Sequence, residues 1–513
     1  MARISSGLRF IANSSTPINQ LPPEILYKVF FHFRPVISRG PEPPRSTREP
    51  FEDLLVVTHT CRHWRITAID ATDLWSQFTT RDPHKNKNFD NMTRLFIGRS
   101  GRAPLDVDLG YKISPVLAPH ADRLRTFSCR KIAINSDEFS QLSSRPAPLL
   151  EEFHILPYEF IDSNCPPLPT LFNHDFPSLR KLVINGYNPF PNNRFRNLSS
   201  FHLQLRAGSV GRVFWAPFFT MLRESPQLEE LYLRCASAND FPQFTKKMPT
   251  PVILHALRKL HLRNIPSSLT GQLLRSVDLI PNGIAMQFTN IVSGLDWLFP
   301  PPTLPLKLSF HAATSLEIIY STRGFVIQGT NQGMRIRVEA LDKDVRYAEI
   351  FSRCMSPQIP VRDLWIHFYR MEDGRGMTKL PPLSEFPHLK KLVVRVTNHG
   401  DPINQLVRML EVDGYVPCPL LSTLDLSGGL SEYCLSKVLR DRSEAGCRLE
   451  RLRLQKRYVS VESIERLGMR NFVDELEICD VDEEPCGMEL PAVCTTNLGG
   501  WWKPWTERRL LYL

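Results

Sequence analysis

Two groups of histidine and cysteine residues have spacings that invite a metal-binding interpretation. His59 and His63 are four residues apart, so a helix would place both imidazoles on one face, and Cys61 stands between them in the sequence. A zinc site needs further ligands, and none follows at a suitable spacing. The cysteines of the acidic stretch 479–494 are separated by six and seven residues, which does not match a usual zinc-binding pair. We therefore predict no metal site and no cofactor.

Catalytic motifs are also missing from the sequence. Ser100 stands between two glycines in the stretch GRSGR, but Arg102 occupies the position at which a nucleophile elbow has its second glycine. The sequence contains no phosphate-binding loop, no dinucleotide fingerprint and no HExxH helix. We predict a protein without catalytic residues. An enzyme whose catalytic residues are dispersed along the chain is an alternative that no motif supports.

Composition narrows the class of protein. Hydrophobic residues make up 42% of the 513 residues, which suffices for a buried core. No apolar run is long enough to cross a membrane, and the N-terminal apolar stretch is too short for a secretory signal. The net charge of +10 arises from scattered Lys and Arg residues without a basic arm, so neither nucleic acid nor a membrane is predicted as a partner. The eleven scattered cysteines are typical of buried thiols in a reducing compartment, and we expect a cytoplasmic and/or nuclear protein.

Residues 18–33, INQLPPEILYKVFFHF, have the pattern of an amphipathic helix. Pro22 and Pro23 stand where a helix begins, because the first turn makes no use of the amide hydrogen that proline lacks. Apolar residues then recur at spacings of three and four, which predicts one apolar face. They are Leu21, Ile25, Leu26, Val29, Phe30 and Phe33. Such a face can pack inside the chain or against another protein.

A second helical stretch follows a proline-rich segment. Residues 34–50 contain five prolines and are predicted to form an exposed loop. Residues 51–69 resume the helical spacing, and the bulky pair Leu74 and Trp75 closes the unit. About 60 residues with a long polar loop form only a marginal core alone. We therefore expect this module to lean on a partner, on the rest of the chain, or on both.

These segments together resemble the F-box, in the F-box-like form common in large fungal families. The Leu-Pro pair opening the first helix, the stretch CRHWRITAI and the closing Leu-Trp pair match in type and order. Downstream, LFIGRSGRAPLDVDL resembles the segment that often follows the box. The resemblance implies a three-helix unit that docks on the small adaptor subunit of a cullin-RING ubiquitin ligase. The proline-rich loop is longer than in a minimal box, but it lies between helices.

The residues expected at the adaptor come from all parts of this module, and some of them must belong to its own core. Sequence alone does not divide the two groups. The set is Leu21, Pro22, Ile25, Leu26, Val29, Leu55, Cys61, Trp64, Leu74 and Trp75.

A repeated pattern follows. It consists of an apolar residue, two variable residues, a second apolar residue, one variable residue and a third apolar residue. Its starts are Leu124, Leu150, Leu179, Leu198, Leu228, Leu257, Val361, Leu389, Leu421, Leu449 and Val473. Consecutive starts are 19 to 32 residues apart, apart from one gap of 104 residues. This period is typical of leucine-rich repeats. It predicts short strands, crossover helices at residues 212–226 and 434–443, and a parallel sheet lining the concave face of a solenoid.

Two regions depart from the period. Residues 263–360 are expected to hold irregular repeats, with strand-like alternation at GIAMQF, TSLEIIY, FVIQG and MRIRVEA, so the number of repeats there stays open. The tail GGWWKPWTERRLLYL contains three of the eight tryptophans. It either caps the open end of the solenoid, the interpretation that we favour, or anchors a partner.

The predicted architecture is α/β, a short three-helix module followed by an irregular leucine-rich-repeat solenoid. The expected segments are a disordered N-terminus (1–17), the F-box-like module (18–80, with the loop at 34–50), a connecting segment with a first irregular repeat (81–123), the solenoid (124–480) and a tail or cap (481–513). Together they predict a substrate-recognition subunit of an SCF-type ubiquitin ligase, in which the box docks on the adaptor and the repeats bind an unknown protein target. The alternative is a repeat scaffold that recruits no ligase.

Overall fold

The computed structural model divides the chain into two compact units, one made mainly of residues 1–236 and the other mainly of residues 246–496. The residues that it describes are 15–34, 52–80, 88–110, 112–130, 136–156, 167–190, 192–205, 214–235, 251–265, 267–278, 283–289, 313–321, 324–331, 334–340, 360–369, 383, 386–396, 402–480, 488, 490 and 492–495. Most of the expected N-terminal disorder, the proline-rich loop after Arg34 and the tryptophan-rich tail lie outside them. None of the described helices is long and apolar enough to cross a membrane.

Three α-helices form the N-terminal part of the first unit. After a short 3-10 turn, η1 (Pro17–Gln20), they are α2 (Pro23–Phe31), α3 (Glu52–Thr60) and α4 (Arg62–Asp70), and the 3-10 turn η2 (Thr72–Trp75) follows them. Helix α2 begins at Pro23 with Pro22 as its N-cap, as the proline pair predicts. The predicted helices near the N-terminus are therefore present.

A parallel sheet follows these helices in the first unit. Its strands are β1 (Gln77–Thr80), β2 (Leu105–Leu109), β3 (Leu124–Arg130), β4 (Glu152–Leu156), β5 (Lys181–Asn185), β6 (Ser200–Leu205) and β7 (Glu230–Cys235). Each strand pairs in parallel with the next one along the chain. Strands β3 to β7 lie at the predicted repeat positions.

The register of this sheet lines up equivalent apolar residues. Phe127 of β3 stands opposite Phe153 of β4, which stands opposite Leu182 of β5, and this row continues through Phe201 to Leu231. All five side chains are buried. Because side chains alternate between the two faces of a strand, the residues between them form a second, mostly polar face.

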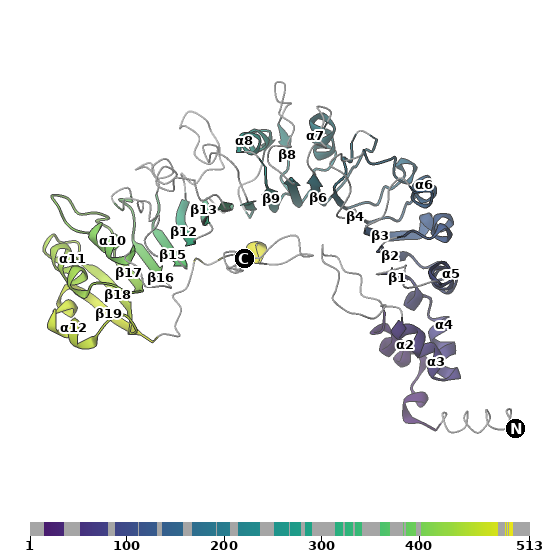
Figure 1. Cartoon of the computed structure of the whole chain (residues 1–513), viewed down its shortest axis with the longest axis horizontal. Coiled ribbons are helices and arrows are strands. Elements are labelled where there is room, and N and C mark those ends of the chain that lie inside the picture. The colour runs from purple at the N-terminus through teal and green to yellow at the C-terminus, as the bar shows by residue number, and fades with distance from the viewer. Residues whose placement is uncertain are drawn as a thin grey trace. The chain divides into compact units, whose positions relative to one another are not determined.

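Helices connect the strands of the first unit and lie on the apolar side of its sheet. They are α5 (Phe89–Arg99), α6 (Asp137–Ser143) and α7 (Trp215–Arg223), together with the 3-10 turns η3 (Pro115–Arg123) and η4 (Phe172–His174). In Figure 1, α5, α6 and α7 lie on the same side of the strands that they join. Helix α7 lies within residues 212–226, where the sequence predicts a crossover helix.

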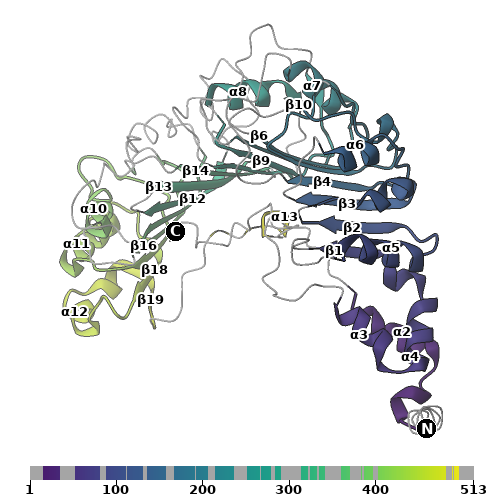
Figure 2. The same ribbon diagram turned by 45° about the vertical axis from the view of Figure 1, so that its right-hand side comes forward.

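The second unit contains another set of parallel strands. They are β9 (Lys259–Arg263), β11 (Ala285–Thr289), β15 (Asp363–Tyr369), β16 (Lys391–Val396), β17 (Thr423–Ser427), β18 (Leu449–Gln455) and β19 (Val473–Cys479), with β8 (Val252–Ile253) and β10 (Val277–Asp278) paired separately. The helices are α8 (Ser267–Arg275), α10 (Pro402–Arg408), α11 (Glu432–Glu444), α12 (Val461–Arg466) and α13 (Ala492–Thr495), with the 3-10 turn η8 (Met469–Phe472). Figure 2 shows α10, α11 and α12 along one side of β16, β18 and β19. Helix α11 contains the second predicted crossover helix, at residues 434–443.

One of three consecutive strands in the second unit breaks the parallel arrangement. They are β12 (Ala313–Ser321), β13 (Gly324–Asn331) and β14 (Met334–Ala340), and β13 is antiparallel to both of its neighbours. The strand-like patterns of this region are confirmed, but the expectation of a parallel sheet is wrong here. Only two residues separate each strand from the next, which suffices for a hairpin but not for the crossover that parallel strands require.

Candidate functional site

The helical module has a small core of its own. Helix α2 contributes Leu26 and Phe30, which have no exposed area, and helix α3 contributes Leu54. The rings of Phe30 and Trp64 lie 5.1 Å apart, so α2 packs directly on α4. The inward-facing apolar surface of α2 therefore includes fewer residues than the single apolar face that the sequence spacing predicts.

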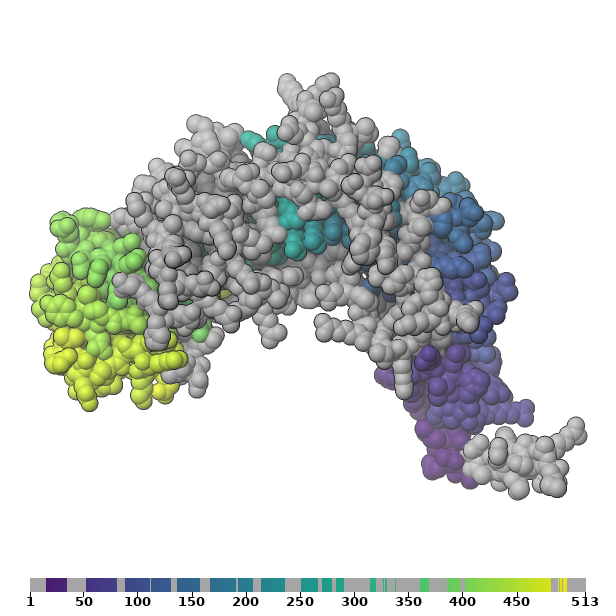
Figure 3. All heavy atoms as spheres, in the orientation of Figure 1, coloured from purple at the N-terminus to yellow at the C-terminus, as the bar shows by residue number. Residues whose placement is uncertain are grey.

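A second apolar stripe on α2 faces outward. Ile25 and Val29 are four residues apart, and Leu21 before the helix and Phe33 after it continue the same spacing. Ile25 is 41% exposed and Phe33 is 40% exposed, while Leu21 and Val29 are half-buried. We call these four side chains the outer stripe. Figure 3 shows the described atoms of the module in purple, and part of their surface is visible without other atoms in front of it.

Cys61 sets the position of α4. It is the N-cap of the helix, with an extended backbone, and its sulfur accepts a hydrogen bond of 3.5 Å from the backbone N–H of Trp64. The side chain of Arg65 donates to the backbone carbonyl oxygen of Thr58 at 2.7 Å, which ties α4 to the end of α3. Because N-capping satisfies an amide that the helix leaves unpaired, Cys61 has a structural role in this module. His59 and His63 flank it, and no group of three metal-ligating side chains forms among the described residues.

Trp75 joins the module to the sheet. Its ring has no exposed area and lies 5.1 Å from the ring of Phe96 on α5, while the guanidinium of Arg99 stands 4.3 Å from its centre. Burial lowers the pKa of Arg99 from its ordinary value. Phe96 also contacts Phe78 of β1 at 5.2 Å. The module and the first strands of the sheet thus share one core.

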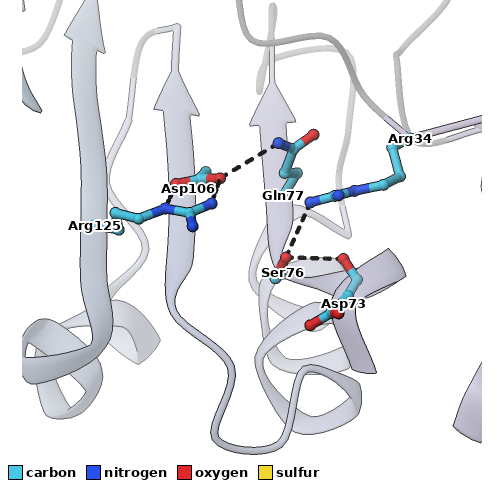
Figure 4. Close-up of polar contacts among 6 residues, drawn as sticks. All are labelled: Arg34, Asp73, Ser76, Gln77, Asp106 and Arg125. Atoms are coloured by element: carbon cyan, nitrogen blue, oxygen red, sulfur yellow. Dashed lines mark hydrogen bonds and ion pairs between the residues drawn. The ribbon is translucent and has the colours of Figure 1, made fainter. Parts of the chain in front are cut away.

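Polar contacts continue this connection across the first strands (Figure 4). The carboxylate of Asp106 on β2 accepts hydrogen bonds from Arg125 on β3, at 2.9 and 2.5 Å, and from Gln77 on β1, at 3.3 Å. Its hydrogen bond with Asp106 raises the pKa of Arg125. Arg34, just after α2, donates to Ser76 Oγ at 3.1 Å, and burial lowers the pKa of this arginine. The end of α2 is therefore attached to the segment that leads into β1.

One serine–histidine contact on the polar face of the first unit's sheet resembles a catalytic arrangement. Ser200 Oγ lies 3.0 Å from His202 Nε2, and Glu230 Oε2 lies 3.6 Å from the same nitrogen. A catalytic triad has its carboxylate on Nδ1, the opposite nitrogen, where it holds the imidazole as a base for the serine. Here the hydroxyl and the carboxylate meet the same nitrogen, so the geometry is that of a polar cluster and not of a triad.

The helical module has a counterpart among known protein families. Residues 18–81 match the family model described as F-box-like. The match spans α2 to η2 and β1, and it confirms the resemblance to the F-box in this region. F-box domains in general bind the small adaptor subunit of cullin-RING ubiquitin ligases and are generally non-catalytic. No curated protein matches the chain.

The F-box-like domain places the side chains expected at the adaptor in three environments. Two are exposed, Pro22 and Ile25. Five are half-buried, Leu21, Val29, Leu55, Cys61 and Trp64. Three have no exposed area and lie in the core, Leu26, Leu74 and Trp75. Side chains in the last group are inaccessible to a partner in this conformation, so we assign them to the stability of the domain.

Other exposed apolar side chains of the F-box-like domain were not in the predicted set. Phe33, Val56 and Ile66 are between 40% and 63% exposed. The signal for Phe33 was present in the sequence, since it follows Val29 at the spacing of the outer stripe. Val56 and Ile66 carried no such signal, because their exposure depends on how α3 and α4 pack.

Proposed function

We propose that this chain is the target-recognition subunit of a cullin-RING ubiquitin ligase. The observation that carries the proposal is the outer stripe, an apolar surface on the first helix of a domain matched as F-box-like. A helix with apolar side chains on two faces can bury only one of them within a domain of this size, and the other suits a partner. Ile25 is the most exposed side chain of α2 within the stripe, and we assign it to contact with the adaptor.

The sheet supplies the second part of the proposal. We propose that the strands after the domain are leucine-rich repeats and that their polar face binds the target. The aligned apolar rows and the parallel pairing of consecutive strands support repeats of this kind. The ligase then acts through proximity, because a target held beside a loaded ubiquitin-conjugating enzyme meets it at a high effective concentration. No catalytic residue of this chain is required for that step.

Binding to the purified adaptor subunit tests the proposal. The full-length chain should bind it, and Ile25→Glu should weaken binding at least tenfold, because it places a charge in an apolar contact. Ile253→Glu is the matched control, since Ile253 is also exposed and lies on β8, outside the F-box-like domain. It should bind as the unchanged chain does.

Two outcomes contradict the proposal. If the folded full-length chain does not bind the adaptor, a scaffold without ligase recruitment becomes the better description. If Ile25→Glu and Ile253→Glu behave alike, the outer stripe is not the docking surface. Far-UV circular dichroism of each variant establishes that the comparison is made between folded proteins.

A further inference from the structure

An apolar pair interrupts the polar face of the sheet in the second unit. Trp365 on β15 and Val393 on β16 stand directly opposite each other in the parallel ladder. Their neighbours Leu364 and Leu392 point to the other face, which is the core, so the pair points away from the core. We call Trp365 and Val393 the apolar pair.

The side chain that covers the apolar pair comes from the C-terminal part of the same unit. Met488 packs against both residues and is itself only 7% exposed, and Leu490 packs at the edge of the cluster. One residue separates Met488 from Leu490 in the sequence, and in an extended chain residues two positions apart lie on the same side. Trp365 and Val393 are thus buried by a segment outside the strands and crossover helices of the unit.

Charged residues surround the apolar pair. Lys391 Nζ stands 5.4 Å from the centre of the Trp365 ring, and Lys391 is opposite Asp363 in the register. Two residues further along the strands, Arg395 is opposite His367. β16 therefore places a cation on either side of Val393. The next strands place acids beside the pair, since Glu317 of β12 is opposite Trp365 and Asp425 of β17 is opposite Val393. The surroundings of the apolar pair are therefore of mixed charge.

We propose that the apolar pair is a binding site for an extended peptide that carries methionine or leucine at two positions separated by one residue. Met488 and Leu490 occupy this site as an internal mimic of that peptide. A tethered segment competes at an effective concentration of about 1 mM, so an external peptide binds well only when the segment is released. The inference rests on the proposed function in one respect, that the external peptide belongs to a target protein.

A labelled synthetic peptide is the probe. It has the sequence of residues 484–495 with serine in place of both cysteines, and its binding to the full-length chain is measured by fluorescence anisotropy. Met488→Glu in the chain should raise the affinity for the peptide at least tenfold, because the internal segment no longer competes. Met488→Leu is the matched control and should bind the peptide as weakly as the unchanged chain, since leucine still fills the site.

Two further changes, one in the protein and one in the peptide, test the same contact. In the Met488→Glu chain, Trp365→Ala should abolish peptide binding. A peptide with glutamate at its methionine should also fail to bind the Met488→Glu chain, and this arm does not alter the fold of the protein. The proposal is overturned if Met488→Glu binds the peptide no better than the unchanged chain, or if the glutamate peptide binds as well as the original.

The result is separable from that of the adaptor experiment. Met488→Glu should leave adaptor binding unchanged, because Met488 lies in the second unit and Ile25 in the first. If the adaptor does not bind but the peptide results hold, the site belongs to a scaffold protein. If the adaptor binds and the peptide results fail, the ligase function stands and its target binds elsewhere.

Discussion

The indole nitrogen of Trp75 donates a hydrogen bond of 2.7 Å to the backbone carbonyl oxygen of Ala68. The bond connects η2 to α4, and the same ring packs on Phe96 of α5. One side chain therefore belongs both to the F-box-like domain and to the start of the sheet. This explains how a domain with a small core is stable at the end of the chain, since it shares a core with the strands that follow.

Replacement of Trp75 should destabilise the first unit, and the size of the loss should depend on whether the new side chain keeps an aromatic ring. Trp75→Ala removes a fully buried ring and should lower the free energy of unfolding by about 3 to 5 kcal/mol. Trp75→Phe keeps a ring but leaves the Ala68 carbonyl without its indole donor, and it should cost about 1 to 3 kcal/mol. Urea denaturation followed by far-UV circular dichroism measures both. Equal losses for the two variants would contradict this account of the ring.

The ion pair between Arg125 and Asp106 should respond asymmetrically to mutation. The side chain of Asp106 is 6% exposed, whereas that of Arg125 is 42% exposed. Arg125→Ala leaves a buried carboxylate without its cation, while Asp106→Ala leaves an arginine that water can reach. We expect Arg125→Ala to lower the midpoint of urea denaturation more than Asp106→Ala does. The reverse order would show that Asp106 is solvated in the folded protein.

Gly428 should tolerate no side chain, unlike its neighbour Gly429. Gly428 has a φ of +147°, and a Cβ atom there would lie 2.7 Å from Ile403 Cδ1 and 2.9 Å from Val396 Cβ. Around Gly429 no atom lies within 4 Å of such a Cβ. Gly428→Ala should therefore destabilise the second unit by at least about 2 kcal/mol, whereas Gly429→Ala should change its stability by less than about 0.5 kcal/mol. Thermal denaturation of the two variants compares them, and similar midpoints would refute the prediction.

Cys418 should be chemically inert in the folded protein. Burial raises the pKa of its thiol to about 12. Its sulfur also donates to the backbone carbonyl oxygen of Leu383 at 3.0 Å. Because the thiolate is the reactive form, iodoacetamide at pH 8.5 should modify the half-buried Cys434 and Cys447 well before Cys418. Mass spectrometry of the native protein checks the order, and early modification of Cys418 would contradict it.

The same raised pKa makes stability depend on pH. In the unfolded chain the thiol has its ordinary pKa and loses its proton above about pH 9, while in the folded chain the raised pKa keeps the proton on the thiol until about pH 12. The stabilisation is therefore fully present below pH 9 and is lost between pH 9 and 12, by at most about 1.4 kcal/mol per pH unit. Cys418→Ala should show a smaller loss of stability between pH 8 and pH 10.5 than the unchanged chain.

Local features were predictable because they depend on residues close in sequence. The pair Pro22 and Pro23 predicted the start of α2, since the effect of proline on a first turn needs no tertiary contact. The alternation after Leu150 or Leu228 predicted strands β4 and β7, because a strand that buries one face must alternate. The resemblance of the box itself was equally local, as the box motifs lie within residues 18–81.

Only the tertiary structure decided which apolar residues are covered, and by what. Ile25 and Leu26 are adjacent and equally apolar, yet Leu26 is fully buried and Ile25 is 41% exposed. Met488 gave no local sign that it packs against Trp365 and Val393, more than 90 residues away in the sequence. The physical reason is the same in both cases. Spacing along the chain determines which side chains share a face, but exposure depends on which distant segment reaches that face.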